Sequence, residues 1–271
     1  MRSLVGLILA VSLWAQAPSY KMPEYKLSPY VEEKLSPGDR TLFRKLMDFE
    51  LESLWAAVTA EGFTQCFINE LNALKANERL VGRARTIRYL PNRPDLRAKL
   101  YGDRPQLNYV SSEDAQPGDV LVFDAGGEIR SAVTGNVTAT RLLARGGTGM
   151  IADGAFRDVP VLAQMPLQIY MRRGQAAGVS PVQMSADYQI PVRIAGVTVI
   201  PGDILVGDAH GILVIPSAMV DKVVERAAST VDREEFQRLL LLGGESIYNV
   251  YPKLSDANQK KYEEYRKNKK R

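Results

Sequence analysis

The sequence contains one cysteine and one histidine in 271 residues. Because Cys66 has no second thiol as a partner, an intrachain disulfide is excluded, and the thiol is expected to be buried in the apolar run Cys66-Phe67-Ile68. One histidine, His210, cannot build a zinc site from paired His or Cys ligands. The GxGxxG and Walker spacings are also absent, which argues against binding of dinucleotides, methyl donors and nucleoside triphosphates.

The chain has little net charge outside its C-terminus. The net charge is +4, and the last twelve residues alone hold seven Lys or Arg against two Glu. A charged terminus without apolar periodicity is typical of a solvated tail, so residues 256–271 are expected to form a basic tail. The rest of the chain is near neutral and predicts no nucleic-acid partner. A hydrophobic share of 45% with 24% charged residues indicates an ordinary globular protein.

The first seventeen residues have the pattern of an export signal. Arg2 is followed by the apolar stretch from Leu4 to Trp14 and by the small-x-small site Ala15-Gln16-Ala17. The apolar stretch is too short to span a bilayer, so no membrane span is predicted. A buried N-terminal helix is the alternative, but the polar residues 18–26 favour export. We therefore expect a periplasmic or secreted protein.

The rest of the chain is predicted to form helices around a set of strands. Residues 38–75 carry apolar positions at helical spacing, whereas Leu80–Arg88 alternate as in a strand. A helix is predicted over Asn136–Arg145, ended by Gly146-Gly147, and a long final helix is predicted to begin at a Ser217 cap. Further strands are predicted at 120–123, 150–152, 192–194, 197–200, 204–206 and 212–215, with a hairpin at Ala195-Gly196.

One segment of the chain is repeated. PGDVLVFDAGGEI at 117–129 aligns without gaps with PGDILVGDAHGIL at 201–213. A Pro-Gly turn, an apolar strand and a glycine turn are thus used twice, which predicts two similar strand units. His210 takes the position of Gly126, so it is interpreted as a turn side chain more readily than as a catalytic base.

The stretch GMIADGAFRDVP at 149–160 is the main candidate for chemistry. We expect its strand to stop at Asp153, which would hold the following turn through backbone N–H groups. In a turn, Arg157 and Asp158 could face one cavity, where the carboxylate would hold a hard divalent ion and the guanidinium a substrate carboxylate. Taken alone, however, an Arg-Asp pair is more typical of a surface ion pair.

The predicted helix at 136 begins with Gly135-Asn136-Val137-Thr138. Free backbone N–H groups at such a helix start favour an anion, such as the carboxylate of a small oxo acid. Asn136 acting simply as a helix cap explains the same residues equally well.

These motifs resemble the RraA-like family, which includes class II 4-hydroxy-4-methyl-2-oxoglutarate and 4-carboxy-4-hydroxy-2-oxoadipate aldolases. The resemblance lies in PGDVLVFDAGG, GNVTATRLLARGGTGMIADGAFRD, IPVRIAGVTVIPGD and GDAHGILVIP. It implies an α/β fold with a swivelling β/β/α core, assembled as homotrimers or homohexamers. Together with the export pattern and the charged C-terminus, it predicts a signal peptide at 1–17, a helical extension at 18–79, the RraA-like core at 80–216, a C-terminal helical segment at 217–255 and the basic tail at 256–271.

The resemblance also implies roles for single residues. Asp158 would bind the divalent metal, Mg²⁺ or Mn²⁺, and Arg157 would contact the substrate. The amides of Val137 and Thr138, after Gly135, would bind the carboxylate of a small 2-oxo acid. Glu234 would complete the site of an adjacent subunit, and Glu235 is the alternative for this role. Glu234 lies three residues and Glu235 four residues beyond Val231 on the final helix.

One position departs from the aldolase pattern. Those enzymes have an acidic residue where this chain has Asn136, whose amide can hold a water molecule but cannot accept a proton near neutral pH. The sequence therefore predicts a metal-dependent lyase that cleaves a 2-oxo acid by a retro-aldol reaction or by decarboxylation of oxaloacetate. The alternative is a non-catalytic regulator that binds a protein partner.

Overall fold

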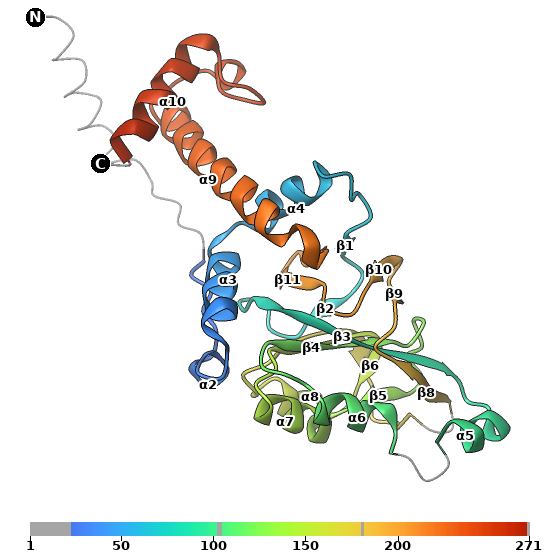
Figure 1. Cartoon of the computed structure of the whole chain (residues 1–271). Coiled ribbons are helices and arrows are strands. Elements are labelled where there is room, and N and C mark those ends of the chain that lie inside the picture. Colours follow the sequence, from blue (N-terminus) through green and yellow to red (C-terminus); the bar gives the residue numbers. More distant parts are fainter. Residues whose placement is uncertain (1–22, 102–104, 180–181, 270–271) are drawn as a thin grey trace, which may run out of the picture. The chain divides into compact units, whose positions relative to one another are not determined.

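The computed structural model describes residues 23–101, 105–179 and 182–269 (Figure 1). These residues divide into a larger unit, Pro23–Val224, and a C-terminal unit that begins at Glu225. The residues of the predicted signal peptide lie outside the described range. No helix among the described residues is long and apolar enough to cross a membrane.

The larger unit is built on a mixed sheet with a parallel centre. Strands β3, β4, β6 and β7 pair in parallel in that order, and β5 also pairs with β6 in parallel. Antiparallel strands extend the sheet on both sides, in the order β1-β12-β11-β3 and β7-β2, and β8 pairs with β3. The bounds are β1 Phe67–Ile68, β2 Asn72–Ala73, β3 Leu80–Pro91, β4 Asp119–Asp124, β5 Ala132–Thr134, β6 Gly149–Phe156, β7 Gln168–Gly174, β8 Gln183–Tyr188, β11 Ile204–Asp208 and β12 Gly211–Ile215.

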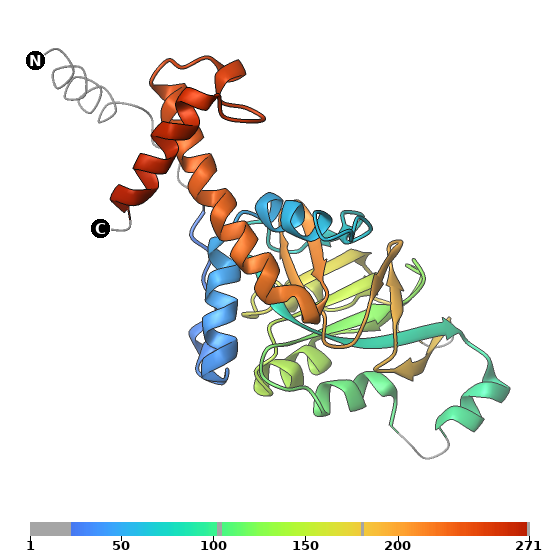
Figure 2. The ribbon, with the colours of Figure 1, turned by 45° about the horizontal axis from the view of Figure 1, so that its top comes forward.

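Both faces of this sheet are buried because its strands alternate between two apolar clusters. In β4, Leu121 and Phe123 join one cluster, whereas Val120 and Val122 join the other. The first cluster includes residues of α6 (Leu107–Glu113), α7 (Asn136–Ala144) and α8 (Val159–Leu162). The second includes the small hairpin of β9 (Val192–Ile194) and β10 (Val197–Val199). Helices and hairpin thus cover opposite faces (Figure 2), which confirms the predicted α/β fold with a β/β/α core.

Most predicted core elements are present. The strands predicted at 80–88, 120–123, 204–206 and 212–215 are β3, β4, β11 and β12, and the predicted hairpin is β9–β10. Helix α7 ends at Ala144 with Arg145 as its C-cap, one residue before the predicted end, and Gly146 follows with a φ of +87°, the left-handed conformation that favours glycine. Ser217 does not cap the final helix, because it is the first residue of a 3₁₀ turn, Ser217–Met219, that precedes α9 (Val220–Leu242).

The helix predicted over 38–75 is wrong beyond residue 59. Helices α3 (Pro37–Asp48) and α4 (Leu51–Thr59) follow the short α2 (Pro29–Glu32), and a break at Phe49 separates α3 from α4. Gly62 then adopts a φ of +94°, and the chain continues as β1, paired with β12, and β2, paired with β7. Pairing with distant strands overrides the helical spacing of this segment.

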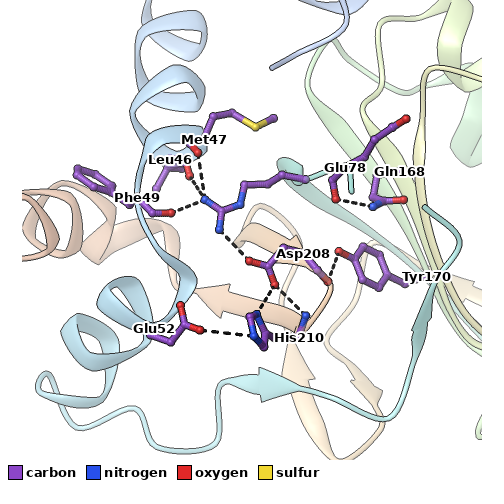
Figure 3. A network of polar contacts seen from close by, with 10 residues as sticks. Leu46, Met47, Phe49, Glu52, Glu78, Gln168, Tyr170, Asp208 and His210 are labelled. Carbon is purple, nitrogen blue, oxygen red and sulfur yellow. Dashed lines mark hydrogen bonds and ion pairs between the residues drawn. The ribbon is translucent and has the colours of Figure 1, made fainter. Parts of the chain in front are cut away.

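A buried arginine ties the N-terminal helices to the sheet. The Arg79 side chain is 0% exposed and donates to the carbonyls of Leu46, Met47 and Phe49. Its Nη2 also lies 2.9 Å from Oδ2 of Asp208, at the end of β11. Figure 3 shows these groups converging between α3, α4 and the β11–β12 turn. The charge of Arg79 is therefore neutralised by one carboxylate inside the protein.

The C-terminal unit contains a small apolar cluster of its own. The later part of α9 packs against α10 (Asp256–Lys269) through Phe236, Leu240, Val250 and Tyr262. The helix over Asp256–Lys269 was not predicted, and Tyr262 on it is buried, with its ring 5.4 Å from that of Phe236. Two tyrosines spaced three residues apart place one aromatic face on this charged helix.

Candidate functional site

A cavity of about 390 Å³ lies where β6 ends. Its walls come from the end of β5, the start of α7, the residues after β6, and two segments more distant in the sequence. Ligands of open α/β sheets commonly bind at the carboxyl ends of the parallel strands, and this cavity has that position. The lining residues are Gln106, Asn108, Tyr109, Ala132, Val133, Thr134, Gly135, Asn136, Val137, Thr138, Arg157, Asp158, Gly178 and Val179.

Asp158 lies against the first turn of α7. Its Oδ2 accepts a hydrogen bond of 3.1 Å from the backbone N–H of Asn136, and its backbone is left-handed, with φ 60° and ψ 32°. An aspartate tolerates this conformation better than most residues, but a non-glycine residue there is often part of a functional site. The cap position is Gly135, so the alternative of Asn136 as the cap is wrong, and the Asp158 carboxylate satisfies the N–H of Asn136 instead.

Gly135 permits this close approach. A Cβ atom at Gly135 would lie 2.3 Å from Oδ2 of Asp158 and 2.5 Å from Cγ of Arg157. Both distances are shorter than any tolerated contact, so only glycine lets the Arg157-Asp158 segment reach the helix start. The glycine is thus required by the position of the Arg157 and Asp158 side chains.

Arg157 and Asp158 form an ion pair, and both also line the cavity. Nε of Arg157 lies 3.5 Å from Oδ1 of Asp158, and the two side chains are 50% and 29% exposed. A pair this exposed contributes little to stability, about 0–1 kcal/mol. The left-handed turn at Asp158 brings both side chains to one cavity, as expected for two residues that bind one substrate and its metal.

The first turn of α7 provides donors in the same cavity. Val137 and Thr138 follow Asn136 at the helix start, where backbone N–H groups have no acceptor within the helix. The hydroxyl of Thr138 is held by that of Thr134 at 2.6 Å. The helix start is therefore positioned for an anion, with the positive end of the helix dipole facing the cavity.

The sequence did not identify one wall of the cavity. Gln106, Asn108 and Tyr109 come from the start of α6, and Gly178 and Val179 from the loop after β7. Helix α6 has seven residues and no side-chain cap, so nothing in its sequence marks it as part of a site. Asn108 is buried and its Oδ1 has no hydrogen-bond partner in the described part of the chain.

The remaining candidate residues lie elsewhere. Glu234 and Glu235 are half-buried on α9 in the C-terminal unit, and the role of Glu234 at a neighbouring subunit stays a prediction. His210 lies in the β11–β12 turn, as predicted, with Nδ1 3.2 Å from Oδ1 of Asp208. Cys66 is buried, as expected, and burial raises the pKa of its thiol.

Among the described residues, Asp158 is the one carboxylate that the cavity offers to a metal ion. Mg²⁺ is commonly bound by one or two carboxylates, with substrate and water oxygens completing its shell. Asp158 fits this pattern because it is partly exposed to the cavity and keeps lone pairs beyond its bond to Asn136. The described residues contain no group of three or more His, Cys, Asp or Glu that could hold a metal by themselves.

Asp153 has a different environment from Asp158. Strand β6 does not stop at Asp153, as predicted, but continues to Phe156 with a register shift between Ala152 and Ala155. Asp153 is 5% exposed; its carboxylate lies 2.5 Å from Nε of Arg172 and accepts the N–H of Ala195 at 2.9 Å. It connects β6 to β7 and to the β9–β10 turn, not to the turn that follows it.

We therefore expect Asp153→Asn to reduce stability before activity. The amide loses the charged bond to Arg172, which we expect to lower the free energy of unfolding by about 1–3 kcal/mol. Urea unfolding of both proteins measures this loss. If Asp153→Asn abolished metal binding while Asp158→Asn left it unchanged, the assignment of the two carboxylates would be reversed.

Comparison with known proteins places the chain in a family. Residues 54–214 match the family model described as "RraA-like: Aldolase/RraA". The match covers more than half of the chain, so this protein belongs to the RraA-like family. It begins within α4, whereas the core was expected to begin at residue 80, and it includes the whole Arg157–Asp158 cavity.

Two relatives carry names that point to aldolases. A Halalkalibacterium halodurans protein named "Putative 4-hydroxy-4-methyl-2-oxoglutarate aldolase" is 31% identical over 157 residues, 58% of this chain and 69% of its own. An Ectopseudomonas mendocina protein of the same name is 37% identical over 106 residues, 38% of this chain and 62% of its own. The match thus leaves about a third of each relative uncovered.

A solved structure relates the chain to regulators as well. Streptomyces coelicolor RraAS2, described as "an unusual member of the RNase ES inhibitor RraA protein family", matches with a TM-score of 0.67 and 28% identity. The match covers 73% of this chain and 96% of that one. An uncharacterized Pseudomonas syringae protein shares the fold, with a TM-score of 0.64 at 22% identity over 78% of this chain and 96% of that one.

Proposed function

We propose that this protein is a divalent-metal-dependent carbon–carbon lyase acting on a small 2-oxo acid. The observation that carries the proposal is the meeting of Arg157, Asp158 and the start of α7 in one cavity. The similarity to two relatives that are named putative aldolases supports the proposal, although the match covers only part of their length. The reaction would be retro-aldol cleavage, decarboxylation of oxaloacetate, or both, since each passes through the enolate of pyruvate.

Substrate binding would use the helix start and the guanidinium. The backbone N–H groups of Val137 and Thr138 would hold the carboxylate at C1 of the oxo acid. Arg157 would donate to the oxygen at C2, where negative charge develops as the bond breaks. The left-handed turn and Gly135 keep Arg157 beside the helix start, so both groups can bind one small substrate.

Bond cleavage would send the C3–C4 electron pair into the C2 carbonyl. In a retro-aldol reaction the C4 hydroxyl loses its proton and leaves as a carbonyl; in decarboxylation CO₂ leaves without a proton transfer. Water then protonates C3 of the enolate and gives pyruvate. Asp158 would hold Mg²⁺ or Mn²⁺, and the ion, when bound, supplies Lewis-acid stabilisation of the developing charge.

Asn136 sets a limit on the retro-aldol route. Its side chain lines the cavity and can orient a water molecule by hydrogen bonds, but an amide does not accept the proton of the C4 hydroxyl near neutral pH. That proton would pass to water, with Asn136 holding the water in place.

A substrate screen tests the proposed function. Purified protein is incubated with oxaloacetate or with 4-hydroxy-2-oxo acids and Mg²⁺, and pyruvate is measured with lactate dehydrogenase. We expect pyruvate release above the rate with Mg²⁺ alone, and its loss when a chelator is added. The absence of pyruvate from every substrate would contradict the proposal.

Replacing Arg157 with Lys should separate substrate binding from metal binding. The lysine keeps the charge but loses the bidentate fork, so we expect kcat/KM to fall by about tenfold or more while Mn²⁺ affinity stays nearly unchanged. Steady-state kinetics and calorimetric Mn²⁺ titration measure the two quantities. A parallel loss of metal affinity would assign Arg157 to the metal site.

The active form should be an oligomer, a homotrimer or a homohexamer. Glu234 would complete the site of a neighbouring subunit, so a monomer would lack one catalytic carboxylate. Light scattering combined with the pyruvate assay tests this expectation. An active species near the chain mass of 30.0 kDa would contradict it.

A protein-binding regulator is the second candidate function. It is favoured by the similarity to RraAS2, which its title relates to an RNase inhibitor family. The export pattern of residues 1–17 would place this protein in the periplasm or outside the cell, away from cytoplasmic ribonucleases. Cell fractionation discriminates the two candidates: a cytoplasmic protein without pyruvate release would favour the regulator.

A further inference from the structure

The two aligned segments of the internal repeat carry different residues in their turns. His210 stands in the β11–β12 turn where the first segment has Gly126. A Cβ atom at Gly126 would meet no other atom within 4 Å, whereas His210 lines a pocket of about 230 Å³. The other residues that line this pocket are Leu51, Glu52, Trp55 and Phe67. The histidine of the turn is therefore also one wall of a pocket.

Contacts from the protein interior orient the imidazole of His210. Its backbone N–H donates to Oδ1 of Asp208 at 2.9 Å, and its Nδ1 lies 3.2 Å from the same oxygen. The other carboxylate oxygen of Asp208 is bound by the buried Arg79 (Figure 3). Because a neutral imidazole carries one N–H, the acceptor at Nδ1 places the proton there and leaves Nε2 with a lone pair. The ring is thus held with Nε2 toward Glu52.

Glu52 brings a negative charge to the same pocket. Its Oε1 lies 3.7 Å from Nε2 of His210, which is longer than a hydrogen bond, and a neutral imidazole has no proton on Nε2 to donate. No Lys or Arg of the described ranges forms an ion pair with Glu52. Its side chain is 64% exposed, so water stabilises the charge and no partner is needed for folding. A cationic ligand can therefore approach this carboxylate without displacing an ion pair.

Two aromatic side chains form the largest part of the pocket walls. Trp55 lies on α4 and is 46% exposed, and Phe67 is the first residue of β1. A Cβ atom at Gly211 would lie 2.3 Å from the carbonyl oxygen of Ile68 and 3.1 Å from Cζ of Phe67. Glycine at this position, where φ is +145°, thus lets β1 and its phenyl ring approach the β11–β12 turn. Leu51, one helical turn before Trp55, is buried and adds only carbon.

Aromatic faces beside a carboxylate favour an organic cation. The electron-rich face of an aromatic ring attracts an ammonium group, and Trp does so most strongly. In the described part of the chain, no Lys or Arg lies over the ring of Trp55 or Phe67. A metal ion would find one carboxylate here and would lose water to carbon surfaces. A quaternary ammonium group presents methyl groups to such surfaces and needs no hydrogen-bond acceptor.

We propose that the pocket of Trp55, Phe67, His210 and Glu52 binds a small quaternary ammonium compound. The methyl groups contact the two aromatic rings, and the positive charge lies near the carboxylate. The volume is below the range of about 300–1,000 Å³ that drug-sized ligands occupy, so the ligand is a small free molecule. The pocket shares no lining residue with the Arg157–Asp158 cavity, and the proposal is independent of the proposed lyase activity.

Choline and its uncharged isostere 3,3-dimethyl-1-butanol test the proposal, because the two differ in the charge of one central atom. Each is titrated with the full-length protein at pH 8, where an ordinary histidine is neutral, and binding is followed by the width of the methyl proton resonance. We expect saturable binding of choline and a Kd for the isostere that is at least tenfold weaker. Equal Kd values would show that the pocket selects apolar shape alone, and would overturn the proposal.

Substitutions at two exposed positions locate the binding. Trp55→Leu keeps an apolar side chain but loses the aromatic face, so the Kd for choline should weaken by about tenfold, whereas Trp55→Phe should stay within about threefold of the wild type. Glu52→Gln removes the charge and should weaken the Kd by about threefold. Glu33→Gln is the matched control, because Glu33 is an exposed carboxylate after α2 that does not line the pocket, and it should change nothing.

The far-ultraviolet circular dichroism of each variant verifies that the fold is retained. Because Glu52 lies at the surface, Glu52→Gln keeps the test valid even if a change at Trp55 were to disturb α4. A wild-type protein without saturable choline binding would overturn the proposal. The same conclusion would follow if folded Trp55→Leu or Glu52→Gln bound choline with the wild-type Kd.

Discussion

Replacing Asp158 with Asn is expected to lower kcat/KM for pyruvate release by roughly a hundredfold to a thousandfold. The amide keeps an oxygen for the N–H of Asn136 and tolerates the left-handed backbone, so the fold should persist. It removes the only carboxylate that lines the cavity within the described residues. Metal affinity and turnover should therefore fall together, and excess Mg²⁺ should restore little.

Asp95→Asn is the control for this experiment. Asp95 is an exposed carboxylate paired with Arg93, and it does not line the cavity. We expect its replacement to leave both Mn²⁺ affinity and kcat/KM unchanged. Wild-type kinetics of the Asp158→Asn protein would show that Asp158 does not hold the metal.

The second large effect concerns stability. Arg79→Met should lower the free energy of unfolding by about 3–5 kcal/mol, because Asp208 would keep a buried charge without its cation. The substitution also leaves the carbonyls of Met47 and Phe49 without the donor that joins the N-terminal helices to β11. Urea unfolding followed by circular dichroism measures the loss.

Arg44→Met is the matched control for Arg79. The Arg44–Glu32 pair has the same charge types, but the arginine side chain is 64% exposed. Its loss should cost no more than about 1 kcal/mol. Equal effects of the two substitutions would show that the buried contacts of Arg79 do not stabilise the fold.

The central strands and α7 could be predicted because local pattern and tertiary structure agree there. The alternation of β4 places Val120 and Leu121 on opposite faces, and Gly146 ends α7 as its sequence indicates. Strands β1 and β2 could not be predicted, since each has two residues and exists only through pairing with β12 or β7. Helix α10 was missed because the partner of its Tyr262 is Phe236, on another helix.

Only part of the candidate site could be predicted from the sequence, for the same reason. Arg157 and Asp158 are adjacent in sequence, so one turn suffices to direct both into a cavity. Asn108 and Tyr109 reach that cavity from almost fifty residues away, through a helix without any distinctive pattern. The extension of β6 beyond Asp153 depends on a register shift against β7, which a single strand sequence does not encode.

The most direct test of the site is the binding of oxalate, whose two adjacent oxygens resemble those of the pyruvate enolate. Calorimetric titration is carried out with and without Mn²⁺ for the wild-type protein and for Asp158→Asn. We expect the wild type to bind oxalate only when Mn²⁺ is present, and Asp158→Asn to bind none under either condition. Oxalate binding that is absent from the wild type, or that is equal in both proteins, would contradict a metal and oxo-acid site at Arg157 and Asp158.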